Sequence, residues 1–220
     1  MAGPADCFSA IDFAIHPTVI AAVSGGSDST ALLVLAQEHL SACAPAAKLL
    51  AVTIDHGLRP ESVSEAKKVA QLCERLGVQH IIKRWSGVKP SSGIQAAARE
   101  ARYDLLSEAA IEHGAGLVLA GHTQDDQVET VMMRRERGDG PGLAGIAPAT
   151  LSFRNDGASP VWFARQMLVL SRAVLREELS RRGDLPRWRY TNSGSESTMD
   201  AIRIARAYTK RDTIMKIFGS

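Results

Sequence analysis

Short apolar runs alternate with longer amphipathic stretches over the first 125 residues of the chain. Four of the runs are apolar at their centres and bounded by Gly, Asp or other polar residues, which is typical of buried parallel strands; they span residues 19–23, 49–54, 79–83 and 117–121. Between them, apolar residues recur at helical spacing over residues 29–42, 62–76 and 93–113. This order predicts βαβ units and an α/β fold with a doubly wound, mostly parallel sheet.

The pattern changes after this region. A fourth helix is expected from about residue 125 to residue 137, and it ends in the glycine-rich segment Gly138–Gly145, which must be a loop. We expect a last strand at residues 161–164, an amphipathic helix at 171–182 and a basic helix at 200–217, with irregular structure at 183–199.

Composition fits a water-soluble domain of ordinary size. Apolar residues make up 45% of the 220 residues, which is enough for a real core. No stretch reaches the roughly 18 apolar residues of a membrane helix, and Asp6 and Asp12 stand where a signal peptide would carry Lys or Arg. The three cysteines, Cys7, Cys43 and Cys73, show no disulfide or metal spacing. We therefore expect a cytoplasmic protein with no membrane partner.

Charge is distributed unevenly along the chain. Residues 1–164 hold 14 Lys and Arg against 18 Asp and Glu, a net charge of −4, whereas residues 165–220 hold 12 against 6, a net charge of +6. A basic block of this kind is suited to a phosphate backbone, although it is also typical of a solvated helical face. We expect an α/β domain at residues 1–164 and a basic, mainly helical segment at 165–220 that packs on it.

The first predicted strand runs directly into Ser24-Gly25-Gly26-Ser27-Asp28-Ser29, and an apolar helix follows. Two glycines allow a tight turn that leaves room for a phosphate against consecutive N–H groups, and a helix N-terminus adds partial positive charge. The carboxylate of Asp28 would repel a phosphate, which indicates a bridging cation such as Mg²⁺. A Ser/Gly-rich turn without a ligand is the alternative, and the loop is not a Walker A motif because no Gly-Lys-Ser/Thr follows.

Two further polar clusters follow predicted strands. The second strand ends at Asp55-His56-Gly57-Leu58-Arg59, and the fourth ends before His122-Thr123-Gln124-Asp125-Asp126-Gln127-Val128-Glu129. Because parallel strands share one carboxyl edge, all three clusters should meet at one cleft. Asp126 and Glu129 are three residues apart at a helix start, so both carboxylates should face one side and could hold a metal or a cationic substrate. Taken singly, each histidine is more typical of a structural role.

Two arginines lie three apart on the third predicted helix. Arg99 and Arg102 stand in Ala98-Arg99-Glu100-Ala101-Arg102-Tyr103, and guanidinium groups are suited to phosphate or to developing phosphoryl charge. Pairing with Glu100 or Asp104 on the surface is the alternative.

Together these motifs resemble the tRNA(Ile)-lysidine synthetase family of the PP-loop ATP pyrophosphatase superfamily. The resemblance covers residues 19–148 densely and corresponds to the N-terminal catalytic domain. It implies an ATP- and Mg²⁺-dependent ligase that forms a carbon–nitrogen bond. The family adenylates the wobble cytidine of a tRNA(Ile) with a CAU anticodon, releasing pyrophosphate, and the side-chain amine of L-lysine then displaces AMP.

The resemblance also implies roles for individual residues. For ATP binding we expect Ser24, Gly25, Gly26, Ser27, Asp28, Ser29, Asp55, His56 and Arg102. We expect Asp28 to hold the metal, and the catalytic set to comprise Asp28, Arg99, His122, Asp126 and Glu129. For tRNA we expect Arg137, together with Arg187, Trp188 and Arg189, where arginines interleave with aromatic residues that can stack on bases. Trp188 could instead anchor a loop to the core.

The chain departs from the family pattern near its C-terminal end. Arg165-Gln166-Met167-Leu168 stands in place of Arg-Pro-Leu-Leu, and Arg189-Tyr190-Thr191-Asn192 in place of Asp-Pro-Ser/Thr-Asn. Two alternatives therefore stay open: a catalytically impaired PP-loop nucleotide-binding protein, or another PP-loop tRNA-modifying enzyme. A homodimer is compatible with the sequence as well.

Overall fold

The fold was analysed in a computed structural model, which describes residues 4–57, 62–87, 89–136, 145–152 and 159–182. Its chain forms two compact units, Met1–Leu185 and Pro186–Ser220, and the second lies outside the described residues. The expected helix at 200–217 and the tRNA-contacting residues at 187–189 therefore lie outside them too. The expected domain division after residue 164 stays a prediction.

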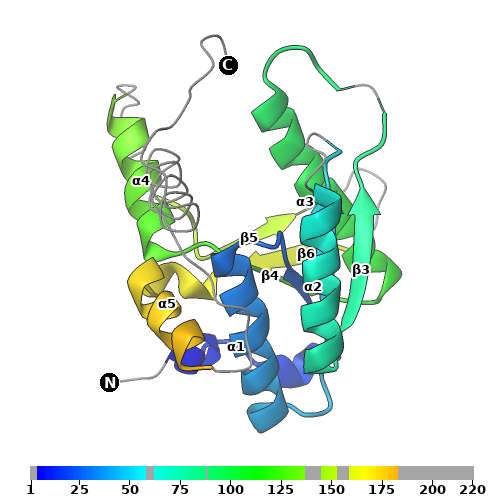
Figure 1. Ribbon diagram of the computed structural model, residues 1–220, viewed down its shortest axis with the longest axis vertical. Helices are drawn as coiled ribbons and strands as arrows, with labels where there is room; N and C mark the ends of the chain where they lie inside the picture. Colours follow the sequence, from blue (N-terminus) through cyan, green and yellow to red (C-terminus); the bar gives the residue numbers. More distant parts are fainter. Residues whose placement is uncertain (1–3, 58–61, 88, 137–144, 153–158, 183–220) are drawn as a thin grey trace, which may run out of the picture. The chain divides into compact units, whose positions relative to one another are not determined.

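A six-stranded sheet forms the centre of the described unit, in the order β3-β2-β1-β4-β6-β5 (Figure 1). Neighbouring strands are parallel except for the antiparallel pair β5 and β6. The strands are β1 (Thr18–Ala22), β2 (Lys48–Asp55), β3 (Gln79–Arg84), β4 (Leu117–Ala120), β5 (Ala149–Ser152) and β6 (Val161–Ala164). The mostly parallel α/β fold expected from the sequence is confirmed, and five of these strands lie where the apolar runs predicted them.

Helices connect the strands in the expected order. They are α1 (Ser27–Cys43), α2 (Ser62–Leu76), α3 (Ile94–Glu112), α4 (Gln124–Glu136) and α5 (Arg172–Arg181), with the 3₁₀ turns η1 (Pro4–Phe8), η2 (Phe13–Ile15) and η3 (Gln166–Val169). The helices α1 and α2 pack against each other and along β2, whereas α3 contacts β1 to β4 and β6. None of the helices among the described residues has the length and apolarity needed to cross a membrane.

The core explains why β1 and α1 carry continuous apolar runs. Val19, Ile20 and Ala21 of β1 are fully buried because β2 and β4 flank the strand and helices cover it. In α1 every residue from Ser29 to Ala36 is buried, since this helix lies between the sheet, η1 and α5. The rings of Phe8 and Phe13 pack beside His39 of α1, with ring centroids 5.7 and 5.5 Å apart.

The order in which the strands join the sheet reverses at β1, and this places the carboxyl ends of β1 and β4 beside each other. From β1 the chain moves outward to β2 and β3, and it then crosses back to β4 on the other side of β1. Ligands of doubly wound folds bind at this kind of switch point, outside the carboxyl ends of the strands. The loop after β1 begins at Val23, and the segment after β4 begins at Gly121.

One strand was not predicted from the sequence. The strand β5 has only four residues, follows Pro148 and pairs with β6 at the edge of the sheet. Its residues are exposed or half-buried, so it carries none of the continuous apolar character by which the buried strands were recognised.

Candidate functional site

The Ser24–Ser29 loop turns tightly between β1 and α1. Gly25 has φ +87°, a left-handed conformation that favours glycine, and a Cβ atom there would lie 3.4 Å from the Glu65 Cβ of α2. The Ser29 hydroxyl donates to the Gly26 carbonyl at 3.0 Å and accepts from the Ser24 N–H at 3.1 Å. Ser29 therefore closes the loop upon itself.

The same loop leaves several backbone donors without an acceptor. Among the described residues, no acceptor is found for the N–H groups of Gly25, Gly26 and Ser27. These groups lie at the N-terminal end of α1, where the first turn of a helix leaves its donors unsatisfied and carries partial positive charge. The arrangement is suited to an anion such as phosphate.

Gly121 allows the end of β4 to approach this loop. A Cβ atom at Gly121 would meet the carbonyl carbon and oxygen of Asp28 and the Cα of Ser29, each at 3.2 Å. Only a residue without a side chain fits this approach unless the helix shifts. The close contact brings His122 and α4 next to the start of α1.

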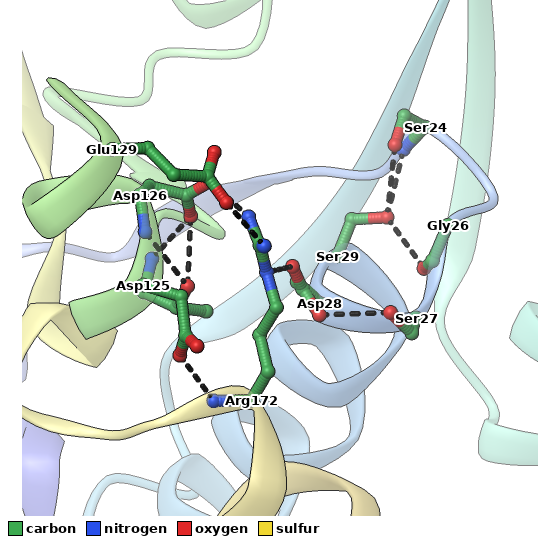
Figure 2. A network of polar contacts seen from close by, with 10 residues as sticks. Ser24, Gly26, Ser27, Asp28, Ser29, Asp125, Asp126, Glu129 and Arg172 are labelled. Carbon is green, nitrogen blue, oxygen red and sulfur yellow. Dashed lines mark hydrogen bonds and ion pairs between the residues drawn. The ribbon is translucent and has the colours of Figure 1, made fainter. Parts of the chain in front are cut away.

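Three carboxylates converge on one arginine, Arg172, at the start of α5 (Figure 2). Its guanidinium donates to Asp28 Oδ2 at 3.2 Å, to Asp126 Oδ1 at 2.5 Å and to Glu129 Oε1 at 2.8 Å. We refer to Asp28, Asp126 and Glu129 as the acidic cluster. Burial of Arg172 lowers the pKa of its guanidinium, but the bond to Glu129 and the charges of the acidic cluster outweigh this effect and raise it above its usual value.

Further hydrogen bonds fix the carboxylates of α4 and α1. Asp126 Oδ2 accepts from both the N–H and the hydroxyl of Thr123, at 2.7 and 2.8 Å. Asp28 Oδ1 accepts from the Ser27 hydroxyl at 2.8 Å, and Asp125 accepts from the backbone N–H of Arg172 at 2.7 Å. The starts of α1, α4 and α5 are thereby joined, and each acidic side chain gains from the positive end of its own helix.

A group of arginines lies around Tyr103. Both Arg99 and Arg102 place their guanidinium carbons 5.7 Å from the Tyr103 ring centroid. Arg165 is only 4% exposed and donates to the Tyr103 hydroxyl and to Thr150 Oγ1, each at 3.1 Å, and to the Ala147 carbonyl at 3.0 Å. Within the part of the chain that the structure describes, no carboxylate pairs with any of these three arginines.

The positive charge of this group acts on two histidines. Burial lowers the pKa of His122 to about 4, with help from Arg165 and Arg102 and against the opposing charge of Asp126. Burial also lowers the pKa of His56, again with a contribution from Arg102. Both imidazoles are neutral at pH 7, and the buried Nδ1 atom of each finds no partner among the described residues.

These features surround a cavity of about 440 Å³. One wall is apolar and includes Ile54, Leu106 and Phe163. The polar lining comes from the loop after β1, two histidines, one arginine, one tyrosine and three carboxylates, namely Ser24, Gly26, Ser27, Asp28, Ser29, His56, Glu65, Arg102, Tyr103, His122 and Asp126. A pocket with an apolar wall and a few convergent polar groups is typical of a small-molecule site.

A family model described as a PP-loop domain matches residues 8–206, most of the chain. The chain belongs to the PP-loop domain family. The Ser24–Ser29 segment, which the sequence predicts to be the PP-loop, lies within the matched residues and lines the cavity; we refer to it as the PP-loop.

Curated relatives of this PP-loop chain are tRNA-modifying enzymes. The tRNA(Ile)-lysidine synthase of Mesorhizobium japonicum is 54% identical over 180 residues, which cover 79% of this chain and 38% of that protein. The tRNA(Ile)-lysidine synthase of Brucella ovis is 45% identical over 183 residues, covering 82% of this chain and 40% of that protein. The chain thus spans about two fifths of the length of these relatives.

Solved structures agree with the fold of the PP-loop domain. The U34-tRNA thiolase NcsA from Methanococcus maripaludis superposes with a TM-score of 0.65 at 18% identity, covering 94% of this chain and 72% of that one. The phosphoadenylyl-sulfate reductase from Candida auris superposes with a TM-score of 0.51 at 10% identity, covering 91% of this chain and 85% of that one. At these identities the likeness concerns the fold alone.

The structure brings most of the predicted site residues together. The PP-loop, His56, Arg102, His122 and Asp126 line the cavity, and Glu129 joins them through Arg172. Arg99 lies beside Tyr103 at the edge of the same region. Arg137 and residues 187–189 lie outside the described residues.

Asp55 lies at the end of β2, beside the turn that carries His56. One of its oxygens accepts from the Gly57 N–H at 2.8 Å, and the other pairs with Arg84 at 3.3 Å. Asp55 is not among the cavity-lining residues, and it shapes the turn that presents His56. Its expected part in ATP binding stays a prediction.

Arg165 and Arg172 are site residues that sequence reasoning missed. Arg165 was noted only as part of an altered motif, and Arg172 only as part of a helix. A signal for Arg172 existed, because it follows the capping residue Ser171 and places a cation at the positive end of a helix. A cation in that position requires carboxylates from elsewhere in the fold.

Proposed function

We propose that this chain carries the catalytic site of a tRNA(Ile)-lysidine synthetase. It would use ATP to adenylate the wobble cytidine of a tRNA(Ile) with a CAU anticodon and then join L-lysine to that base, releasing AMP and pyrophosphate. The observation that carries the proposal is the cavity, whose lining combines the Ser24–Ser29 loop, the carboxylates of Asp28 and Asp126, and Arg102, which pairs with no carboxylate among the described residues. The identity to curated lysidine synthases supports it, and because the chain spans about two fifths of those proteins, the whole activity is a proposal.

The cavity is suited to ATP. The free N–H groups of Gly25, Gly26 and Ser27 would hold the β- and γ-phosphates, which leave together as pyrophosphate. The apolar wall of Ile54, Leu106 and Phe163 is suited to the adenine ring. Arg102 and Arg99 would stabilise the charge that develops at the α-phosphate, since no carboxylate neutralises them among the described residues.

The donors also fit Mg²⁺. Asp28 and Asp126 reach the same guanidinium, so their carboxylates lie within reach of one cation, and oxygen ligands of this kind, completed by phosphate oxygens and water, suit magnesium. No group of three or more metal-binding side chains was found in the described part of the chain. When bound, Mg²⁺ would neutralise part of the charge of the leaving pyrophosphate.

The acidic cluster is suited to the amine substrate. Asp126 and Glu129 already bind a cationic side chain in the form of Arg172, and they would bind the lysine ammonium in the same way. One of the two would accept its proton, so that a neutral amine attacks the adenylated base. The neutral imidazole of His122, whose Nδ1 has no partner among the described residues, would donate or accept a hydrogen bond at the reacting groups without carrying charge.

The alternatives differ in their chemical requirements. A thiolating enzyme with this fold would need reactive cysteines at the site, whereas Cys7, Cys43 and Cys73 lie on η1, α1 and α2 and none lines the cavity. Burial moreover raises the pKa of Cys73 to about 11, which disfavours the thiolate. A protein that binds nucleotide without catalysis would not require the acidic cluster that the chain retains.

The proposal is tested by incubating the protein with ATP, labelled L-lysine and tRNA(Ile) transcripts. We expect ATP-dependent transfer of label to the transcript with a CAU anticodon and none to a transcript with a GAU anticodon. Asp28→Asn should lower the rate at least a hundredfold, because it removes charge that the metal needs. Arg181→Gln, which alters an exposed arginine that pairs with Glu177 and Glu178 of its own helix, should leave the rate unchanged. Transfer that does not depend on ATP or on Asp28 would overturn the assignment.

A further inference from the structure

Arg172 occupies an electrostatically unusual position. It is the first residue of α5, where the helix carries partial positive charge, so its own helix disfavours its guanidinium. The acidic cluster compensates for this with three carboxylates, one from α1 and two from α4. With one guanidinium against three carboxylates, the group keeps a net charge of −2 and can still attract a cation.

The three ion pairs of Arg172 differ in their exposure to water. The side chains of Asp28 and Asp126 are 24% and 25% exposed, and that of Arg172 is 21% exposed. Glu129 is 54% exposed and is held by the terminal Nη1 atom alone. Exposed ion pairs contribute little to the stability of a structure, because water competes for both partners. The contact with Glu129 is therefore the one that a ligand can most easily replace.

We propose that Arg172 determines the affinity and selectivity of the amine subsite by acting as its built-in competing cation. In the free protein the guanidinium spans the acidic cluster, and the incoming ammonium displaces it from Glu129 and binds beside it at Asp126. Asp28 and Asp126 keep their contacts with Arg172 during this exchange. The inference rests on the proposed function for the identity of the amine, L-lysine, but the competition itself concerns any small cation.

Two opposing effects decide the outcome of removing the charge. Loss of Arg172 removes a positive charge that repels the incoming ammonium. A unit charge a few ångströms away changes the affinity for a cation by roughly threefold to a hundredfold, if the effective dielectric constant lies between those of water and a protein surface. Loss of Arg172 also removes the cation that holds the carboxylates together. A partly exposed ion pair changes an equilibrium constant by only about fivefold or less. Repulsion is the larger effect, so affinity for the amine should increase.

The test compares lysine binding by calorimetry in the full chain and in Arg172→Gln. We expect the variant to bind lysine about tenfold more tightly and to lose discrimination against shorter amines such as ethylammonium. Arg172→Lys keeps a positive charge near the acidic cluster, so its lysine affinity should stay within about threefold of the parent. Arg181→Gln, on the same helix and outside the site, serves as the matched control.

Guanidinium ion gives a second readout that needs no lysine. In Arg172→Gln the guanidinium ion should fill the vacated position and raise the melting temperature at millimolar concentration, whereas neutral urea of the same shape should not. The parent protein should show no such response. If the parent binds no lysine at all, the proposed function fails, and the guanidinium experiment still tests the competing cation.

A third readout uses the unaltered protein and therefore does not depend on the folding of a variant. Saturating lysine should shift the NMR signals of the Arg172 guanidinium and speed the exchange of its Nη hydrogens. The proposal is overturned if these signals stay unchanged. Equal or weaker lysine binding by a folded Arg172→Gln, or a response of that variant to urea as strong as to guanidinium, would overturn it as well.

Discussion

His122 shows how the fold adjusts the chemistry of a single residue. Its ring lies beside the cavity among Arg165, Arg102 and Arg99, and it is buried enough that the protonated form is strongly disfavoured. A histidine with a pKa of about 4 cannot act as a cationic acid at neutral pH. Its expected catalytic role is therefore that of a neutral hydrogen-bonding group.

This assignment predicts a pH dependence of stability. Because the pKa of His122 is lower in the folded protein than in the unfolded chain, the unfolded chain binds more protons between pH 6.5 and about 4. The stabilisation that depends on a neutral His122 is complete above pH 6.5 and is lost as the pH falls through this window, by up to roughly 3 kcal/mol. Urea unfolding of the parent and of His122→Gln at pH 7.5 and pH 4.5 measures the difference.

The parent should lose more stability than the variant on acidification. An NMR titration provides a direct check, with the His122 ring signal assigned by its absence in the variant. A midpoint near 6.5 for that signal would contradict the electrostatic account of the site.

Some residues of the site could be predicted from the sequence, and others could not. The PP-loop, His122 and the acidic cluster were recognised because each lies directly after a predicted strand or at a predicted helix start. Arg165 and Arg172 belong to the same site but lie on or before α5, about 40 residues beyond the nearest of those motifs. The contacts of Arg172 depend on the packing of α5 beside α1 and α4, and those of Arg165 on the placement of β5 and α3 around it. No local pattern encodes that packing.

At the scale of elements, the start of α4 is tied to the segment that follows the glycine-rich loop. The Gln127 side chain donates to the Ile146 carbonyl at 3.2 Å and accepts from the Ile146 N–H. The amide thus pairs with this backbone as a neighbouring strand would. Gly145 lies so close to the same amide that a Cβ atom there would collide with it.

Gln127→Glu should therefore destabilise the protein. The substitution removes the donor to Ile146 and places negative charge against a carbonyl oxygen, which should cost roughly 1 to 3 kcal/mol. Gln124→Glu makes the same chemical change at an exposed position in the first turn of α4 and should cost little, since acidic residues are favoured there. Urea unfolding midpoints of the two variants provide the comparison, and equal midpoints would contradict the role given to Gln127.

The elements themselves were largely predictable. Apolar runs located β1, β2, β3, β4 and β6, and the most continuous runs belong to β1, β2 and β4, which lie inside the sheet, whereas β3 lies at its edge and is exposed or half-buried. The Ser62-x-x-Glu65 pattern and Gly77 marked the ends of α2. The edge strand β5 was missed because its pairing with β6, rather than its own sequence, makes it a strand. Helix ends differed by one or two residues from those expected, which is the usual spread at frayed termini.

At the scale of the whole molecule, charge separates the two ends of the chain. Residues 165–220 carry the positive excess, with 12 Lys and Arg against 6 Asp and Glu, while the remainder is net negative. Arg165, Arg172, Arg181 and Arg182 all make polar contacts within the described unit. We therefore expect residues 183–220, which lie outside the described part, to provide most of the affinity for tRNA.

The salt dependence of the affinity for tRNA tests this expectation. If about four basic side chains contact phosphates of a single-stranded anticodon loop, log affinity should fall against log salt with a slope of roughly −3. Replacing Arg187 and Arg189 together should flatten the slope by about one unit and leave ATP binding unchanged. Salt-insensitive tRNA binding, or a double variant that binds tRNA as the parent does, would contradict the tRNA-binding role of residues 183–220.

The central claim is that one cavity serves both adenylation of the base and its ligation to lysine. The most direct measurement omits lysine, supplies ATP labelled at the α-phosphate together with the CAU transcript, and follows the label on the RNA before and after lysine is added. The account predicts that labelled AMP becomes attached to the transcript and is released when lysine joins the base. If label never appears on the RNA while lysine transfer proceeds, or if lysine fails to release it, the two steps do not share this site.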